Sequence, residues 1–473
     1  MEEDKLKKLR ALLAVLPAHA VGPMAAAIET DRVAGGSLPH DEMLASLRPG
    51  LRKIARERLG PPSPSRVVYE PLADFLVNTA PATKRIGTIQ RASLLPVWTW
   101  VVNDLVPKEI GPLVKSLRKA ILTGDADIIG PAADSVREVM AGAIGQGFAG
   151  VVPRSPSQDA LVTKLGSALA VEDAREIGLL LAAAPSFAAV RALIPSCSKR
   201  LTDPELVQLK DIYDALAGTL PDQAIYIPII AMRRLARPWQ MMDVLRALGR
   251  VDNDTALSRT TLGLGGNLLL DELTDHARYL MKVKLGETDT AEVLRELGIF
   301  ADVSAGMSQA FDIKRLGPWG QQLAKVRKDV SDAMERQVER LPDALISAFP
   351  VQVAGGFGPK GVHRPDVTQW PDEEKITLAV NLALFLEGSR WDANKALFSA
   401  AHRAASDRVG RFLISYGDFL MNEIRLAAAG TEEAQRCQAH LEALLRCTEL
   451  VLGSQEADLL RRRAINAGGP AAA

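Results

Sequence analysis

Cysteine is scarce in this chain of 473 residues, which contains only Cys197, Cys437 and Cys447. A small, odd number of cysteines gives no disulfide framework and is typical of a reducing compartment, so the sequence predicts a cytoplasmic protein. Aromatic residues are also few, at 5%, which argues against the stacking surfaces that bind single-stranded nucleic acids. An excess of one charge is missing too, because 57 basic side chains balance 57 acidic ones, whereas dedicated nucleic-acid-binding proteins are usually strongly basic.

Long hydrophobic runs are absent as well. No segment approaches the roughly 18 consecutive apolar residues of a membrane span, and the longest uncharged stretch, 139–153, contains four glycines. Pro17 ends the apolar run 11–16 after six residues, whereas a secretory signal peptide needs about 7–15. The sequence therefore predicts no transmembrane segment and favours an amphipathic first helix over a signal peptide.

The motifs of familiar enzymes are missing. No alternation of strands and helices appears, which disfavours Rossmann, P-loop and TIM-barrel enzymes. Glycines at 145, 147 and 150 match the dinucleotide-binding pattern, but helical residues precede them, so we interpret them as a helix end or a close helix crossing. Cys437 and His440 would supply only two of the three or four ligands that zinc needs. We expect no cofactor and no metal, and the absence of these motifs disfavours an enzyme, which stays the alternative.

Helical periodicity dominates what the chain does contain. Between residues 323 and 341, apolar side chains recur at steps of three and four, with charged side chains between them. The pattern returns after Trp391, and Thr202 with Glu205 has the spacing of a helix-starting capping box. We predict an all-α, multi-helical fold, either an irregular α-solenoid-like array or a helical bundle, with long C-terminal helices.

Proline and glycine divide the predicted helices into three regions. Residues 1–155 form an N-terminal helical region, 156–300 a solenoid-like region of short paired helices, and 301–473 a region of long helices with a loop at 350–369. A loop of this length is usually either functional or a plain connector. Several tryptophans stand at predicted helix boundaries, where we expect them to pack against the first helical turn: Trp239, Trp319, Trp370 and Trp391.

Positive charge is concentrated near the N-terminus. Residues 44–123 contain 13 basic and 5 acidic side chains, a net charge of +8, so the rest of the chain carries −8. Such a patch can bind an acidic protein surface, an anionic membrane or a nucleic acid, or the acidic C-terminal half of the same chain can neutralise it. The candidate binding residues are Arg48, Arg52, Lys53, Arg56, Lys84, Arg85 and Arg91.

An acidic cluster with a histidine is the second candidate site. On a helix, Asp271 aligns with Asp275, and Glu272 with His276. The favoured interpretation is a solvated helix face with an intrahelical pair of Glu272 and His276, and the alternative is a pocket that also includes loop residues. The residues of this alternative pocket are Asp271, Glu272, Asp275, His276, His363 and Arg364.

These observations favour a cytoplasmic helical scaffold, adaptor or regulatory protein that acts through protein–protein contacts. The expected partner is a protein, with an acidic surface as one option, and nucleic acid or anionic membrane is less favoured. The alternative is an all-helical enzyme or small-molecule binder with a site near residues 271–276 or in the 350–369 loop.

Overall fold

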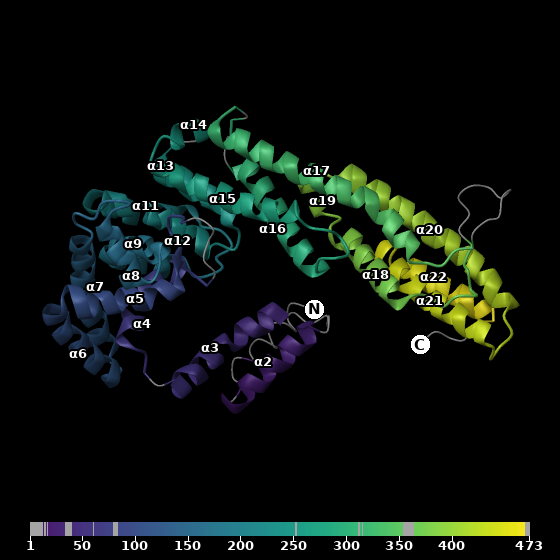
Figure 1. Ribbon diagram of the computed structural model, residues 1–473, viewed down its shortest axis with the longest axis horizontal. Helices are drawn as coiled ribbons and strands as arrows, with labels where there is room; N and C mark the ends of the chain where they lie inside the picture. The colour runs from purple at the N-terminus through teal and green to yellow at the C-terminus, as the bar shows by residue number, and fades with distance from the viewer. Residues whose placement is uncertain are drawn as a thin grey trace. The chain divides into compact units, whose positions relative to one another are not determined.

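The computed structural model describes residues 13, 16, 18–33, 40–59, 61–78, 84–250, 253–310, 313–314, 316–352 and 364–468. In this part of the chain the regular structure is almost entirely helical, which confirms the predicted all-α fold (Figure 1). Two short parallel strands, β1 (Leu76–Val77) and β2 (Ile89–Gln90), pair in the register Leu76 with Ile89. The chain divides into a compact N-terminal unit, Met1–Ala188, and a compact C-terminal unit, Ala189–Ala473. This division lies at neither of the boundaries expected near 155 and 300, and the three-region scheme stays a prediction.

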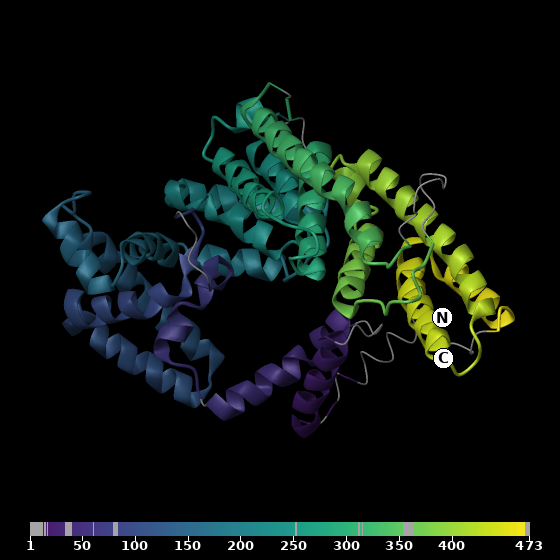
Figure 2. The same cartoon turned by 45° about the vertical axis from the view of Figure 1, so that its right-hand side comes forward.

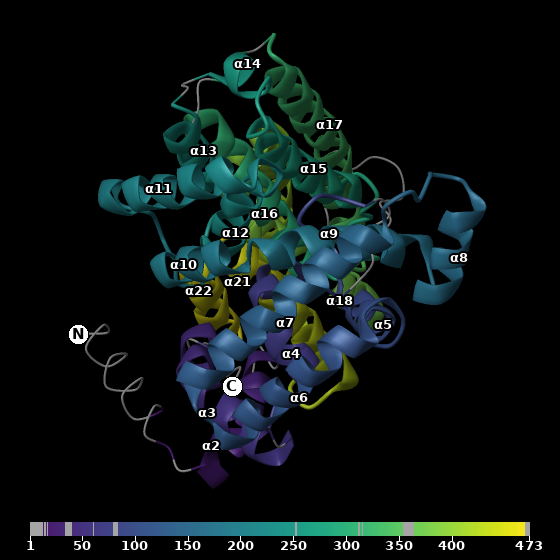
Figure 3. The same cartoon turned by 90° about the vertical axis from the view of Figure 1, so that its left-hand side faces the viewer.

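The N-terminal unit consists of helices and the two short strands, and Figure 3 shows its helices α5, α6, α7 and α9. Its elements are α2 (Ala18–Val33), α3 (His40–Leu59), α4 (Pro64–Val68), η1 (Glu70–Phe75), β1, β2, η2 (Arg91–Ser93), α5 (Leu94–Trp100), η3 (Val101–Leu105), α6 (Pro107–Thr123), α7 (Ala126–Gly147), α8 (Pro156–Leu165) and α9 (Ala168–Ala182). The next helix, α10 (Ala184–Leu193), contains the division between the units.

Small residues allow α7 and α9 to pack closely. A Cβ atom added at Gly178 of α9 would lie 2.8 Å from the side chain of Ile144, so a larger residue there would force the helices apart. Gly147 is the last residue of α7 and contacts the ring of Trp100, and Gly150 has a φ of +79° in the following turn. The glycine pattern at 145–150 is therefore a helix end and a close crossing, as interpreted from the sequence.

A buried ion cluster links the segment before β2 to α9. Lys84 Nζ lies 2.6 Å from Asp173 Oδ1 and 2.6 Å from Glu176 Oε2. The Asp173 side chain is fully buried and the Lys84 side chain is 17% exposed. Because a buried carboxylate without a partner is strongly destabilising, the Lys84 ammonium is required by the two acids that surround it.

The same two carboxylates also organise the backbone that enters η2. Asp173 Oδ2 accepts hydrogen bonds from the Gln90 amide at 3.0 Å and from the Ser93 hydroxyl at 2.6 Å. Glu176 Oε1 accepts a hydrogen bond from the Gly87 amide at 2.6 Å. Two residues one turn apart on α9 therefore hold the whole segment 84–93 in place.

We predict that Lys84→Met lowers the free energy of unfolding by about 3 kcal/mol, because it leaves the Asp173 and Glu176 charges buried without a cation. The matched control is Lys164→Met, which breaks the exposed ion pair of Lys164 with Asp104 in the same unit. That control should lower the free energy of unfolding by less than about 1 kcal/mol. Urea unfolding of both variants measures the difference, and equal losses would contradict the assigned role of Lys84.

The C-terminal unit contains the longer helices. Its elements are α11 (Asp203–Thr219), η4 (Pro221–Gln223), α12 (Tyr226–Arg234), η5 (Pro238–Gln240), α13 (Met241–Gly249), α14 (Asp254–Leu257), α15 (Gly263–Leu280), α16 (Thr290–Ala310), α17 (Pro318–Ser347), α18 (Glu373–Gly388), α19 (Asp392–Lys395), α20 (Ser399–Leu426), α21 (Glu432–Val451) and α22 (Ser454–Asn466).

The predicted long C-terminal helices are confirmed. The helices α17, α20 and α21 have 30, 28 and 20 residues, and Figures 1 and 2 show α18, α20, α21 and α22 side by side. The apolar stripe of α17 faces the core, since each of its expected positions is buried: Leu323, Val326, Val330, Met334, Val338 and Leu341. Periodicity in the sequence thus identifies the packed face of α17.

The boundary tryptophans have two different environments. Trp319 is 1% exposed and lies against Gly266, where an added Cβ atom would come within 2.2 Å of its ring. Trp239 packs in the same way against Gly306. In contrast, Trp391 is 82% exposed, so its expected packing at a helix start is wrong.

None of the described helices is by itself long and apolar enough to cross a membrane. The bent pair formed by α9 and α10 passes that test, by length and composition only.

Candidate functional site

One residue of the predicted basic patch, Lys84, lies inside the N-terminal unit and is not available to a partner. Lys84 is bound by Asp173 and Glu176 and is therefore committed to an internal contact. One interpretation of the patch is that the acidic C-terminal half of the chain neutralises it, and for Lys84 this is wrong, because both carboxylates belong to α9. The physical reason is local: the chain returns from β2 through α7 to place α9 beside the segment 84–93.

The structure describes three of the other predicted side chains. Arg48 is exposed on α3, Arg85 is half-buried, and Arg91 donates a hydrogen bond from Nε to Asn78 Oδ1 at 3.0 Å. The side chains of Arg52, Lys53 and Arg56 lie outside the described residues. The patch as a binding surface stays a prediction.

The acidic-histidine cluster on α15 connects helices. Glu272 forms an ion pair with Arg233 of α12 at 2.8 Å, and His276 Nδ1 lies 2.5 Å from Glu296 Oε2 of α16. The expected intrahelical pair of Glu272 and His276 is therefore wrong, since each side chain has a partner on a neighbouring helix. Both contacts fix the positions of α12 and α16 relative to α15.

The other acids of this cluster lie closer to solvent. Asp275 pairs with Arg278 one turn later on α15 at 2.6 Å, and Asp271 is half-buried. Ion pairs within α15 or to its neighbours therefore account for three of the four predicted residues. The cluster thus links α15 to its neighbouring helices, and the alternative pocket around it stays a prediction.

Both arms of the predicted 350–369 loop are held against the long helices. Val351 and Pro365 form an antiparallel bridge, and the Gln352 amide donates to the Arg364 carbonyl at 2.9 Å. The Arg364 guanidinium lies 5.3 Å from the ring centre of Phe419 on α20. His363, the other predicted loop residue, lies outside the described residues. The base of the loop is thus a fixed part of the C-terminal unit.

A buried histidine anchors this loop base. His440 of α21 is fully buried, with Nε2 3.0 Å from the Gln369 carbonyl and Nδ1 2.7 Å from the Tyr416 hydroxyl. The Tyr416 hydroxyl also lies 3.2 Å from the Pro350 carbonyl. Burial lowers the pKa of His440, which favours the neutral ring that donates from Nε2 and accepts at Nδ1. One side-chain network therefore connects both ends of the loop to α20 and α21.

An open cavity of about 580 Å³ lies beside this anchor, and we call it the Trp370 cavity. Trp370, which follows the loop and is 50% exposed, forms part of its wall. Most other lining residues come from the end of α20, the tight turn at Gly430 and the first turns of α21. The lining residues are Trp370, Ile424, Ala427, Ala429, Gly430, Thr431, Ala434, Gln435, Cys437, Gln438, Ala439, Glu442 and Gly468.

Three carboxylates, those of Glu423, Glu433 and Glu442, lie in the lining of this cavity or near its Cys437, and we call them the acidic rim. Burial is the main cause that raises the pKa of Cys437 to about 11, and the nearby carboxylates of Glu433 and Glu423 raise it further. Glu442 lines the cavity directly and accepts a hydrogen bond from Gln438 Nε2 at 2.9 Å. The Oε1 atom of Gln438 is buried, and none of the described residues donates a hydrogen bond to it. The cavity thus combines apolar walls with an acidic rim.

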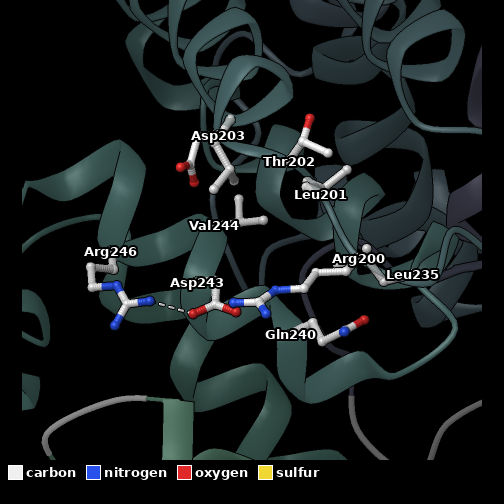
Figure 4. A pocket seen from close by; sticks show the side chains of 10 residues that line it. Arg200, Leu201, Thr202, Asp203, Leu235, Gln240, Asp243, Val244 and Arg246 are labelled. Atoms are coloured by element: carbon white, nitrogen blue, oxygen red, sulfur yellow. Dashed lines mark hydrogen bonds and ion pairs between the residues drawn. The ribbon is translucent and has the colours of Figure 1, made fainter.

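A second cavity, of about 450 Å³, lies where α11 and α13 begin, and we call it the Arg200 cavity. Figure 4 shows the guanidinium groups of Arg200 and Arg246 together with the Asp243 carboxylate and the Gln240 amide. Arg246 is paired with Asp243 at 2.5 Å. The residues that line the Arg200 cavity are Arg200, Leu201, Thr202, Asp203, Leu206, Leu235, Gln240, Asp243, Val244 and Arg246.

Of the residues that line the two cavities, Thr202, Trp370 and Cys437 stand out in the sequence, and none of them for a role in a binding site. Among the described residues, no three His, Cys, Asp or Glu side chains are grouped so that they could hold a metal ion. The chain matches no protein-family model, no curated protein and no solved structure, so its function is argued from the geometry of these cavities.

Acidification should destabilise the C-terminal unit through His440. An unfolded histidine takes up a proton near pH 6.5, whereas burial lowers the pKa of His440 in the folded state. The unfolded chain therefore binds more protons between these two pKa values, so the stabilisation is complete above about pH 6.5 and is lost as the pH falls. Burial also lowers the pKa of His402, which adds to the effect with the same sign.

Urea unfolding at pH 7.5 and pH 5 measures this dependence. We predict a lower unfolding midpoint at pH 5 for the natural chain and a smaller difference between the two pH values for His440→Gln, which cannot be protonated. An unchanged pH difference in that variant would show that His440 is not one of the groups responsible. The pKa of Asp366 is lowered, mainly by its hydrogen bond from the Thr368 hydroxyl, so this carboxyl titrates below the tested range.

Proposed function

We propose that this chain is a helical adaptor or scaffold protein and that the Trp370 cavity binds a segment of a partner protein. The observation that carries the proposal is the cavity of about 580 Å³ with an acidic rim beside the half-exposed Trp370. The cytoplasmic location expected from the cysteine content forms part of the same proposal.

Apolar surface continues outside the cavity, which favours a protein partner over an isolated small molecule. Leu426 directly precedes the lining residue Ala427 and is 78% exposed. An exposed tryptophan beside an apolar depression is a typical centre of binding energy in protein interfaces. The partner would insert an apolar side chain between Trp370 and Ile424 and extend over the turn between α20 and α21.

Charge defines the chemistry of the partner segment. Glu423, Glu433 and Glu442 belong to the helices that form the cavity, and the charges of Glu433 and Glu423 add to the burial that raises the pKa of the Cys437 thiol. Opposite charges across an interface accelerate association and exclude partners of the wrong sign. The partner segment therefore carries lysine or arginine next to its apolar anchor, and the acidic rim disfavours nucleic acids and anionic membranes at this site.

The test places a photo-reactive benzoylphenylalanine at Ala434, which lines the cavity, and at Lys328, an exposed position on α17 that does not. Crosslinking in the native cell and mass spectrometry then identify the captured segment. We predict a segment with an apolar residue flanked by basic residues that is captured at 434 and not at 328. Capture of acidic segments, or equal capture at both positions, would contradict the proposal.

Binding of the captured segment as a synthetic peptide gives the quantitative test. Trp370→Ala should weaken binding by about tenfold or more, because it removes the aromatic wall. The matched control is Trp391→Ala, which removes a more exposed tryptophan of the same unit and should leave affinity unchanged. Replacing Glu423, Glu433 and Glu442 with glutamine should weaken binding most at low salt, where charge attraction is least screened.

A further inference from the structure

The wall of the Trp370 cavity includes the point at which the chain leaves α22. This helix ends at Asn466, and Gly468, two residues later, is one of the residues that line the cavity. Gly468 is also the last residue that the structure describes. The residues that follow it in the sequence therefore start at the cavity wall.

A hydrogen-bonded turn fixes the position of Gly468. The Ala467 amide donates to the Arg463 carbonyl at 3.0 Å, and the Gly468 amide donates to the Ile465 carbonyl at 3.0 Å. Ala467 is buried, and Gly468 has a φ of +92°, a left-handed conformation that glycine adopts without strain. The turn after α22 thus brings the backbone to the cavity at one defined place.

Covalent geometry keeps the next residues close to this place. Residues 469–473 lie outside the described residues, but five extended residues span at most about 18 Å, so residue 473 cannot be farther than that from Gly468. A segment that is tethered so closely has an effective concentration in the millimolar range at the site. Even a weak contact between this segment and the cavity walls therefore competes with a partner that arrives from solution.

The composition of the 469–473 segment, Gly-Pro-Ala-Ala-Ala, suits the apolar walls of the cavity. Its side chains are small and apolar, and proline is a common ligand of aromatic-lined grooves in peptide recognition. Trp370 and Ile424 provide the larger apolar surfaces of the lining. The segment contains no lysine or arginine, so it has nothing to offer the acidic rim. It therefore has the apolar feature expected of the partner and lacks the basic one.

We propose that the 469–473 segment occupies the Trp370 cavity in the free protein and that a basic partner displaces it. Its proline and alanines pack against Trp370 and Ile424. A partner with lysine or arginine gains the attraction of the acidic rim, which the segment does not use, and this difference favours the exchange. The inference rests on the proposed function of the cavity and gives that site an internal competitor.

Hydroxyl-radical footprinting with mass spectrometry tests the contact without any partner. The measured quantity is the oxidation rate of Trp370, and Trp391, an exposed tryptophan of the same unit, is the internal reference. The serine–glycine variant combines Pro470→Ser with Ala471→Gly, Ala472→Gly and Ala473→Gly, which keeps the length of the chain and removes the apolar side chains. We expect it to raise the oxidation rate of Trp370 about twofold or more relative to Trp391, because the indole loses its apolar cover.

A matched pair of charge variants tests whether the segment lies beside the acidic rim. Ala472→Lys supplies the positive charge that the natural segment lacks, so it should strengthen the contact and slow the oxidation of Trp370. Ala472→Glu introduces the opposite charge, which the rim repels, so oxidation should become faster. Both effects should shrink at high salt, because salt screens exposed charges.

Binding of the captured partner peptide should respond in the corresponding direction. The serine–glycine variant should bind the peptide about threefold more tightly, and Ala472→Lys about threefold more weakly, because the tethered competitor is removed or strengthened. The control Gln455→Lys adds the same charge at an exposed position on the first turn of α22 that does not line the cavity. It should change neither the oxidation of Trp370 nor the affinity.

The two readouts separate this inference from the proposed function. Equal oxidation of Trp370 in the natural chain and the serine–glycine variant would overturn the inference, even if a basic peptide binds the cavity. Protection of Trp370 by the segment in a protein that captures no basic peptide would support the contact and contradict the adaptor function. Peptide binding whose affinity is the same in the natural chain, the serine–glycine variant and Ala472→Lys would show that the segment does not compete.

Discussion

The hydrogen bonds of one buried imidazole determine the geometry of the Trp370 cavity. His440 has no access to water, so both ring nitrogens need partners in the protein, and they find them in Tyr416 and in the Gln369 carbonyl. Gln369 directly precedes Trp370, and the bond to its carbonyl therefore fixes the backbone from which the indole extends. A long loop usually loses conformational entropy when its ends are held. Here the hydrogen bonds of Tyr416 and His440 to the carbonyls of Pro350 and Gln369 offset that cost at the loop base. The position of the indole is therefore fixed before a partner binds.

Small residues are the second constraint, because they decide which helices can approach one another. Gly266 and Gly306 each receive an indole ring at a separation that no Cβ atom would allow, and Gly178 has the same role between α7 and α9. Alanines in the turn after α20 and in the first turn of α21 have the opposite consequence. Ala427 and Ala434 present no bulky side chain to fill the space in front of Trp370, and a cavity remains. Small residues thus allow close packing at the helix crossings, and they also leave space for a cavity at the candidate site.

Local features of the fold could be predicted from the sequence, whereas the partners of its polar side chains could not. The α17 stripe, the Thr202 capping box and the glycine-rich end of α7 depend on residues within a few positions of one another, so periodicity and spacing identify them. Lys84 pairs with acids 89 and 92 positions away, and His276 pairs with Glu296 across a helix crossing. Nothing in the local sequence distinguishes such residues from solvated charges. The tryptophans show the same limit: Trp319 and Trp391 occupy similar boundary positions, yet one is buried and the other exposed, because only Trp319 meets a glycine on another helix.

Charge counted along the chain is a poor guide to charge in space, and the candidate site illustrates why. The excess of basic residues at 44–123 is evident in the sequence, but the charge of Lys84 is neutralised by two buried carboxylates of the same unit. The sequence does not indicate that Glu423, Glu433 and Glu442 form an acidic group, because they are nine or ten positions apart and basic residues lie between them. A helix, a tight turn and a second helix bring them to one cavity, where Arg425 and Arg436 are already engaged with Asn422 and Glu432. What a charged side chain can offer to a partner is decided by the groups that the fold places around it, and Glu442, the charged residue in the lining of the Trp370 cavity, has the neutral amide of Gln438 as its hydrogen-bond donor.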